Sequence, residues 1–248
     1  MSDAARILER TRSTYANCRS YRDIGEATTV SIRGEKPWQR FTFRKPFQTA
    51  FVRPHRFLFE FKEMSVGPND EWPHRAVWRN AVGVFTWATH ESETRGIEPC
   101  PSIERVLEQW SAASDRASHI VPHLLGLCGG TSPLPETSAV ELVGRDEVDG
   151  RGAWRIQSTR FAHVEVHWID VDRHLVLRTF ARTRHTPELH RALRDAQLSR
   201  PELTADERER LAREPVPTDS FTLETTVFYR PEFDIDIDDR AFDVRPPA

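Results

Sequence analysis

"FQTAFVRPHRFLFEF", residues 47–61, places five phenylalanines within fifteen residues of a chain that is otherwise rather polar, with 38% hydrophobic and 29% charged residues. The aromatic pattern begins earlier and occupies odd-numbered positions: Phe41, Phe43, Phe47, Phe51, Phe57, Phe59 and Phe61. Because side chains two residues apart project to the same face of a strand, this spacing predicts strands with one aromatic face. The segment Arg53-Pro54-His55 interrupts the pattern and marks a hairpin or bend, since proline cannot donate to a strand ladder.

The remaining chain alternates between helical and strand periodicity. Residues 2–17 predict a helix, and Ser102 is expected to cap the first of two helices that run to about residue 127. Strand alternation covers residues 21–89, 139–158, 163–180 and 220–230, with hairpin tips at Asp149-Gly150 and Asp172-Arg173. This order favours an α+β fold in one domain, residues 1–248, with a curved antiparallel sheet and helices against a single face.

A highly charged segment, residues 186–215, predicts two short helices between late strands. Thr186 with Pro187 starts one of them, and Thr204 with Glu207 has the spacing of a capping box for the other. The apolar stripe of these helices is thin, so we expect an insertion that covers one end of the sheet. Residues 187–213 are a possible contact for a protein partner.

Charge and cysteine content exclude several classes of protein. The net charge of −3 gives no overall positive field that would favour nucleic acid or an anionic membrane. The three cysteines, Cys18, Cys100 and Cys128, have no CxxC spacing and imply neither a disulfide framework nor a zinc knuckle. No run of about 20 apolar residues predicts a transmembrane segment, and no apolar core of a signal peptide is seen, so the chain as written is expected in the cytoplasm.

Histidine and carboxylate residues offer one candidate for metal chemistry. His163, Glu165 and His167 alternate on one strand and are chemically able to bind Zn²⁺ or Fe²⁺, which makes a metal-dependent enzyme an alternative function. Three ligands on one extended strand lie too far apart to converge easily, and the other interpretation is a solvent-facing side. The side expected to turn inward then carries Val164, Val166 and Trp168. No GxSxG, P-loop or GxGxxG motif is present, so we expect no cofactor and no catalysis.

Five phrases occur in a characteristic order: "TYANCRSYRDIGEATT" (14–29), "FQTAFVRPHRFLFEF" (47–61), "VGVFTWAT" (82–89), "DEVDGRGAWRI" (146–156) and "VHWIDVDRHLVLR" (166–178). Together they resemble the bacterial LolA-like proteins, the outer-membrane lipoprotein-carrier superfamily. The resemblance implies an incomplete barrel, with helices in its concave face and an apolar cavity that holds acyl chains. The segment 186–215 departs from the plain hairpin of that family.

The resemblance also implies a function and a set of site residues. The chain would bind or carry a lipid, a lipoprotein acyl chain or another hydrophobic ligand, without catalysis, and would be periplasmic if the sequence is a mature form. Arg53 would hydrogen-bond to a helical lid, as a guanidinium can. The cavity would be lined by Phe41, Phe43, Phe51, Phe57, Phe59, Phe61, Trp78, Trp87 and Leu124. A further alternative is a sensor or interaction module whose barrel is filled by its own side chains.

Overall fold

The computed structural model describes residues 2–34, 36–63, 73–90, 93–94, 96–128, 134–135, 140–160, 162–201 and 203–244. The helices are α1 (Asp3–Asn17), α2 (Ile103–Trp110), α3 (Ala117–Leu124), α4 (Pro187–Leu198) and α5 (Ala205–Arg213), with short 3₁₀ turns η1 (Pro37–Gln39) and η2 (Asp239–Phe242). The strands are β1 (Ser20–Ile32), β2 (Arg40–Val52), β3 (Arg56–Lys62), β4 (His74–Arg79), β5 (Val84–His90), β6 (Glu93–Thr94), β7 (Glu98–Pro99), β8 (Val140–Val148), β9 (Arg151–Arg160), β10 (His163–Asp170), β11 (Val176–His185), β12 (Phe221–Phe228) and β13 (Glu232–Phe233).

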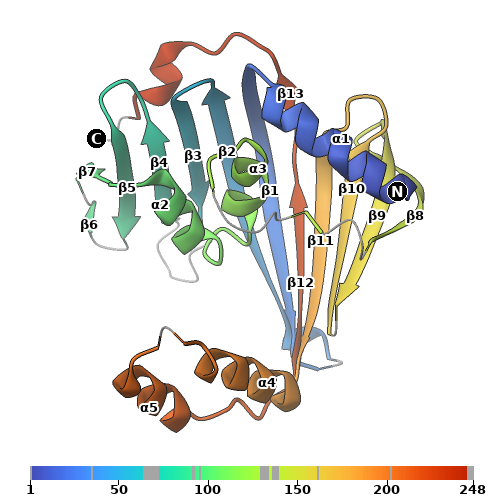
Figure 1. The fold of residues 1–248 in the computed structure, drawn as a ribbon, viewed down its shortest axis with the longest axis vertical. Coiled ribbons are helices and arrows are strands. Elements are labelled where there is room, and N and C mark those ends of the chain that lie inside the picture. The colour runs from blue at the N-terminus through green and yellow to red at the C-terminus, as the bar shows by residue number, and fades with distance from the viewer. Residues whose placement is uncertain are drawn as a thin grey trace.

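The strands form a thirteen-stranded antiparallel sheet in the order β6-β5-β4-β3-β2-β1-β12-β11-β10-β9-β8, with β7 beside β5 and β13 beside β1. Strands β6 and β8 end this order, and in the described part of the chain they do not pair with each other, so the barrel is open. Helices α1, α2 and α3 lie against one face of the sheet (Figure 1). The predicted α+β class, with an incomplete barrel and helices on one face, is confirmed.

The phenylalanine pattern follows the register of the sheet. Phe47 pairs with Phe61, and Phe51 pairs with Phe57, so their side chains share one face. This face also packs against α1, α2 and α3, and we call it the concave face. The predicted aromatic face of β2 and β3 is therefore confirmed, and it forms the main core of the molecule.

Helix α1 is the first element that covers the concave face. Ser2 caps it by accepting a hydrogen bond from the backbone N–H of Ala5 at 3.3 Å. Its buried stripe is Ala4, Ala5, Ile7, Leu8, Thr11 and Tyr15. These positions recur at helical spacing, so one side of α1 packs on the sheet while the charged side faces water.

The opposite face of the sheet, the outer face, has apolar clusters of its own. One contains Ala50, Leu58, Ala76, Trp78, Trp87 and Phe242. A second contains Val148, Ala153, Val166, Trp168 and Leu177. Strand alternation places both clusters away from α2 and α3, because Leu58 lies between Phe57 and Phe59 on β3. Apolar side chains therefore stabilise both faces.

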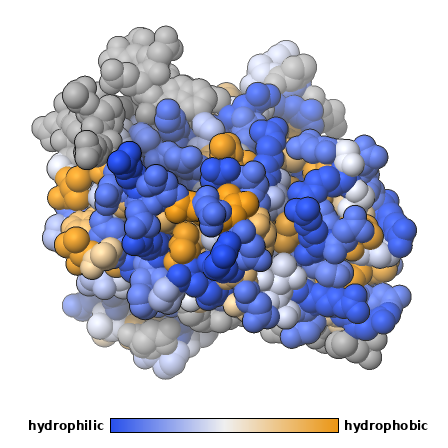
Figure 2. All heavy atoms as spheres, turned by 90° about the horizontal axis from the view of Figure 1, so that it is seen from above, coloured by the Kyte–Doolittle hydropathy of each residue, from blue (hydrophilic) through white to orange (hydrophobic). Residues whose placement is uncertain are grey.

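Helices α4 and α5 lie between β11 and β12, where the sequence predicts them. Thr186 accepts a hydrogen bond from the N–H of Leu189, and Thr204 with Glu207 forms the capping box. No residue of either helix is buried. The pair lies at the end of the sheet where β1 turns into β2 (Figure 1). Seen from above, toward the opposite end, the surface is mainly hydrophilic with a few apolar patches (Figure 2).

Candidate functional site

The part of the concave face around Phe51, Phe57 and Phe59, which we call the upper concave face, is closely packed. Phe51, Phe57 and Phe59 are almost fully buried, as is Phe61. The ring centroids of Phe59 and Phe61 are 5.8 Å apart, and Phe61 meets Trp110 of α2 edge-on at 5.7 Å. These are the separations at which aromatic pairs add to the stabilisation from apolar burial. In this state, side chains fill the space beside the upper phenylalanines.

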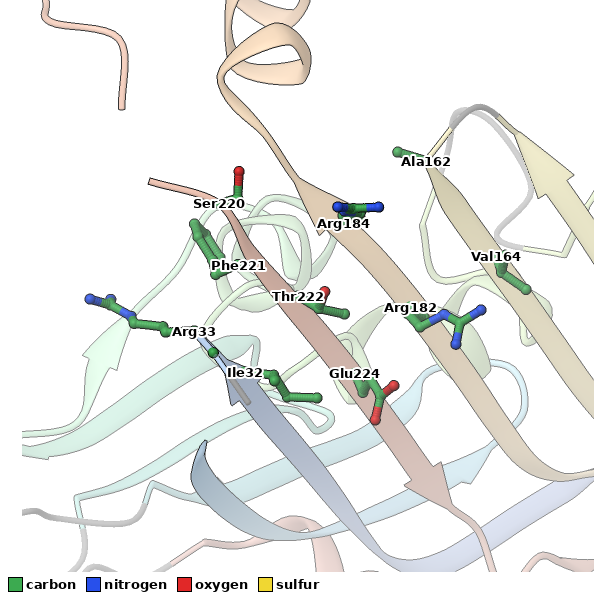
Figure 3. Close-up of a pocket in the computed structure, with 11 residues that line it drawn as sticks. Ile32, Arg33, Ala162, Val164, Arg182, Arg184, Ser220, Phe221, Thr222 and Glu224 are labelled. Atoms are coloured by element: carbon green, nitrogen blue, oxygen red, sulfur yellow. The ribbon is translucent and has the colours of Figure 1, made fainter. Parts of the chain in front are cut away.

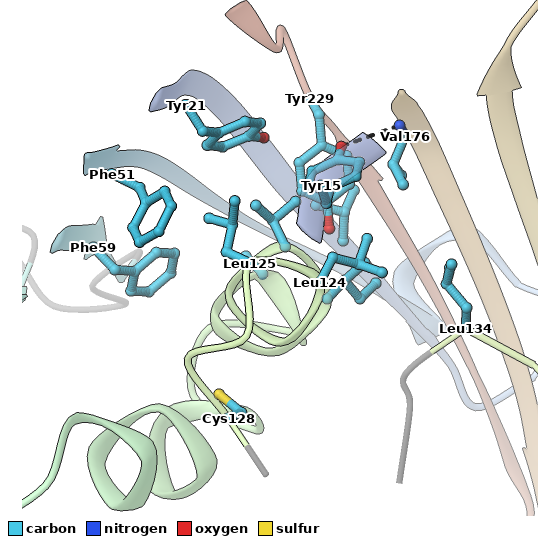
Figure 4. Close-up of a cluster of buried hydrophobic side chains, with 14 of the residues drawn as sticks. Tyr15, Tyr21, Phe51, Phe59, Leu124, Leu125, Cys128, Leu134, Val176 and Tyr229 are labelled. Carbon is cyan, nitrogen blue, oxygen red and sulfur yellow. Dashed lines mark hydrogen bonds between the residues drawn. The ribbon is translucent and has the colours of Figure 1, made fainter. Parts of the chain in front are cut away.

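Helix α3 supplies most of the filling on the opposite side of that space. Its buried residues include Ile120, Val121 and Leu124, and Leu125 follows directly after the helix. Figure 4 shows Leu124 and Leu125 between the sheet strands and α3, near Phe51, Phe59 and the tyrosines. The predicted site residue Leu124 therefore shares one cluster with Phe51, Phe57, Phe59 and Phe61.

The part of the concave face around Phe41 and Phe43, which we call the lower concave face, is more open. Phe41 and Phe43 continue the same side of β2, since the pairing of β1 with β2 is regular from Val52 to Arg40. The Phe41 residue is 51% exposed and Phe43 is half-buried. The aromatic row thus runs from a closed, packed region to a region in contact with solvent.

Two predicted lining residues do not lie on this face. Trp78 and Trp87 belong to the outer-face cluster with Phe242, although they pair with strands that carry the phenylalanines. Trp78 is opposite Leu58 in the register, and Leu58 is itself an outer-face residue. The prediction that both tryptophans line the concave face is therefore corrected by the strand register.

Arg53 lies in the turn between β2 and β3 and contacts the end of α1. Its Nε donates to the carbonyl of Cys18 at 2.8 Å, and its Nη2 donates to the carbonyl of Tyr15 at 3.0 Å. The last carbonyls of a helix have no partner within the helix, so the guanidinium satisfies groups that need a donor. That this contact holds a lid closed stays a prediction.

The turn between α2 and α3, residues 111–116, is tied to the sheet on two sides. Lys45 of β2 pairs with Asp115 at 3.2 Å and also donates to the carbonyl of Ala113 at 2.6 Å. Arg116 pairs with Glu165 of β10 at 2.8 Å. Strands β2 and β10 are separated by β1, β12 and β11, so this turn spans the concave face.

The carboxylate of Glu165 is the centre of a buried polar group. Nε2 of His167 lies 3.4 Å from it, and Nε2 of His163 lies 3.9 Å from it. Burial raises the pKa of Glu165, but the two neighbouring histidines and the charge of Arg116 outweigh burial and hold this pKa well below its usual range. Glu165 therefore stays ionised under the helix pair.

This arrangement corrects the expectation of a solvent-facing side for this part of β10. His167 is completely buried on the concave face, whereas Trp168 and Val166 lie on the outer face. Glu165 is occupied by Arg116, and in the described part of the chain no group of three His, Cys, Asp or Glu side chains is arranged to hold a metal ion. The sequence pattern identified His163, Glu165 and His167 as a group, but it did not identify Arg116 as the partner of Glu165.

A second buried polar group was not predicted from the sequence. Asp23 of β1 is 1% exposed, and the hydroxyl of Tyr21 donates to its Oδ2 at 2.6 Å. Burial raises the pKa of Asp23 to about 6, although the hydrogen bond from Tyr21 lowers it. The hydroxyl of Tyr15 nearby accepts from the N–H of Val176 at 3.2 Å (Figure 4). Tyr15, Tyr21 and Asp23 all lie in the phrase 14–29, whereas Val176 belongs to the distant strand β11, and the sequence does not show that these groups are buried together.

Comparisons with known proteins show distant likenesses. No family model matches the chain, and no curated protein matches its sequence. Solved structures that align with it include a DUF1329 family protein from Desulfovibrio piger (15% identity, 96% of this chain and 95% of that chain, TM-score 0.34). A putative outer membrane lipoprotein-sorting protein domain from Vibrio parahaemolyticus also aligns (7% identity, 96% of this chain and 95% of that chain, TM-score 0.34). So does a LolA superfamily protein from Nitrosomonas europaea (9% identity, 98% of this chain and 98% of that chain, TM-score 0.30). The last two carry names from the superfamily that the sequence phrases resemble.

The helices of the described residues were also compared with the requirements of a membrane span. None of them combines the length and the apolar composition that crossing a bilayer as a helix requires.

Proposed function

We propose that the concave face binds a lipid, a lipoprotein acyl chain or another hydrophobic ligand without covalent chemistry. The observation that carries this proposal is the exposure gradient along one aromatic row. Phe47 is 4% exposed, Phe43 is half-buried and Phe41 is 51% exposed, although all three share one side of β2. An ordinary core does not continue into solvent as a row of phenylalanines, because each exposed ring forgoes the stabilisation of burial.

Apolar contact would provide the affinity. Burying a methylene contributes about 0.8 kcal/mol, so an acyl chain of roughly a dozen carbons could gain several kcal/mol after the cost of ordering it. The lower concave face supplies the first contacts, at Phe41 and Phe43. Deeper binding requires the α2–α3 pair to move away from Phe59 and Phe61.

The contacts that hold the helix pair suit such a movement. The turn at residues 111–116 is fixed by the pairs Lys45–Asp115 and Arg116–Glu165. Lys45 and Asp115 are mostly buried, whereas the Arg116 side chain is 31% exposed, so water can replace part of the second contact when the turn leaves the sheet. We infer that the ligand enters between this turn and the lower phenylalanines.

Native mass spectrometry of the gently purified protein, followed by lipid extraction, tests the proposal. We expect an acyl species to co-purify, or an offered fatty acid to bind. Phe43→Asp should abolish binding, because it places a charge where the apolar chain would lie. Phe180→Asp is the matched control, since Phe180 is a half-buried phenylalanine on the outer face.

Circular dichroism must first show that both variants fold. Loss of binding in Phe43→Asp alone supports a concave-face site. A ligand-free wild type that takes up no fatty acid refutes it, and so does equal binding by wild type and Phe43→Asp.

A protein-interaction module is the second candidate, and α4 with α5 favours it. No residue of either helix is buried, and Leu193 of α4 is exposed. Deleting residues 187–213 should then remove a co-purifying protein partner while the melting temperature stays unchanged. A partner that remains bound after this deletion would contradict the second candidate.

A further inference from the structure

The end of the sheet where β1 turns into β2 combines exposed aromatic and basic side chains. Trp38 in η1 is 69% exposed, and Phe41 at the start of β2 is 51% exposed. The ammonium group of Lys36 lies 5.0 Å from the ring centroid of Trp38. Large exposed aromatic side chains beside cations are typical of surfaces that meet a membrane interface. We call residues 33–44 the tip.

The tip has an excess of positive charge that the described protein does not neutralise. Arg33, Lys36, Arg40 and Arg44 are exposed, and none of them forms an ion pair with another described residue. The sequence of the tip contains one acid, Glu35. The net charge of the whole chain is −3, so this positive charge is local to one end of the molecule.

A hollow of about 690 Å³ lies beside the tip, at the end of the sheet formed by β1, β10, β11 and β12. Arg182 and Arg184 lie on one side of β12 with Ile32 and Val164, whereas Arg33 lies on the other side, beside the ring of Phe221 (Figure 3). Glu224 is the acid among its lining residues, against three arginines. The register places hollow and tip together, because Ile32 pairs with Arg40 on one side and with Thr222 on the other.

We propose that the tip and this hollow form a docking surface for an anionic lipid bilayer, with a lipid phosphate beside Arg182 and Arg184. Guanidinium groups match phosphate oxygens in geometry and charge. Trp38 and Phe41 enter the headgroup region, where amphipathic aromatic rings are favoured. The apolar part of the hollow receives the glycerol end of the lipid. This surface goes beyond the ligand site on the concave face. The two share Phe41 and Phe43, and the variant that tests the surface changes neither of them.

Sedimentation with vesicles tests the proposal without any cavity ligand. The wild-type protein should bind vesicles of phosphatidylcholine with one third phosphatidylglycerol and should not bind pure phosphatidylcholine. Binding should fall steeply as NaCl rises from 50 to 500 mM, because salt screens the attraction. The variant Trp38→Ser/Arg184→Ser should lose at least fivefold in partition coefficient, the factor expected for one arginine near an anionic surface.

A matched double variant controls for general loss of apolar and positive surface. Val82 and Arg230 are exposed at the opposite end of the sheet, so Val82→Ser/Arg230→Ser should bind as the wild type does. Absence of binding to anionic vesicles overturns the proposal, as does equal loss in both variants. Binding of a single-stranded oligonucleotide or of inorganic phosphate, with no binding to vesicles, also overturns it.

Discussion

Replacing Asp23 by asparagine should stabilise the protein at neutral pH. The folded protein raises the pKa of this buried carboxyl from 3.8 to about 6. Because each unit of pKa difference corresponds to about 1.4 kcal/mol, keeping Asp23 ionised in the folded state costs about 3 kcal/mol at pH 7. Asparagine cannot ionise, and its side-chain oxygen can still accept the hydrogen bond from Tyr21.

The sign of the pH dependence follows from the direction of the shift. The folded state holds the Asp23 proton more tightly than the unfolded state, so this group favours folding most below about pH 4. That contribution is lost as the pH rises from about 4 through 6. The unfolding free energy of Asp23→Asn minus that of the wild type should therefore increase by about 3 kcal/mol between pH 3 and pH 7.

Urea denaturation followed by circular dichroism, at intervals of one pH unit, measures this difference. Asp219→Asn is a suitable control because Asp219 is exposed in the segment before β12. A change with pH of the same size in Asp219→Asn would mean that the burial of Asp23 is not the cause. A constant difference for Asp23→Asn, or one that falls as the pH rises, would refute the assignment of a buried carboxyl with a raised pKa.

Three further predictions concern other contacts. Gly25→Ala should destabilise the fold by about 1–3 kcal/mol, because its new Cβ would lie 2.3 Å from the carbonyl oxygen of Phe228. Urea denaturation measures this loss. An unchanged denaturation midpoint would contradict the close approach. Arg53→Ala should lower the unfolding free energy by about 1–3 kcal/mol, because the carbonyls of Tyr15 and Cys18 lose their donor. Hydrogen exchange at the end of α1 should become faster for the same reason. Exchange that becomes equally faster in α5 would argue against a local effect. Glu165→Gln should destabilise the protein at pH 7 by about 1–3 kcal/mol. Because the folded protein lowers the pKa of Glu165, this difference should begin to shrink below about pH 4.5 and continue to shrink as the pH falls further. A difference that grows with acidity would contradict the ion pair with Arg116.

The sequence predicts the elements of this fold well and the sides of its strands only in part. The odd-numbered phenylalanines identify one face of β2 and β3 because five of them are buried together against helices. Alternation identified two sides of β10 but not which side faces α3. Both sides are largely buried, with His167 on the concave face and Trp168 on the outer face. Where a sheet has apolar clusters on both faces, hydrophobic alternation cannot distinguish them.

The polar part of the candidate site was less accessible to sequence reasoning. Asp23 is unremarkable in the sequence, and its raised pKa arises from burial, which no local pattern of the sequence predicts. Arg116 lies 49 positions from Glu165, and no spacing rule connects them. Such pairs follow from strand order and helix packing, which single-sequence patterns do not determine.

Among the residues that the structure describes, β8 pairs on one side only, with β9, and the features of this strand affect the solubility of the protein. A free strand edge can add a strand from another molecule and so begin aggregation. In β8 the pairing register shifts between Leu142 and Gly144, where Gly144 has a φ of 139°, and the segment that follows carries Arg145, Asp146 and Glu147. A kinked, charged edge is a poor template for a second strand. At the other margin, β6 is only two residues long. The sheet can therefore remain open without polymerising.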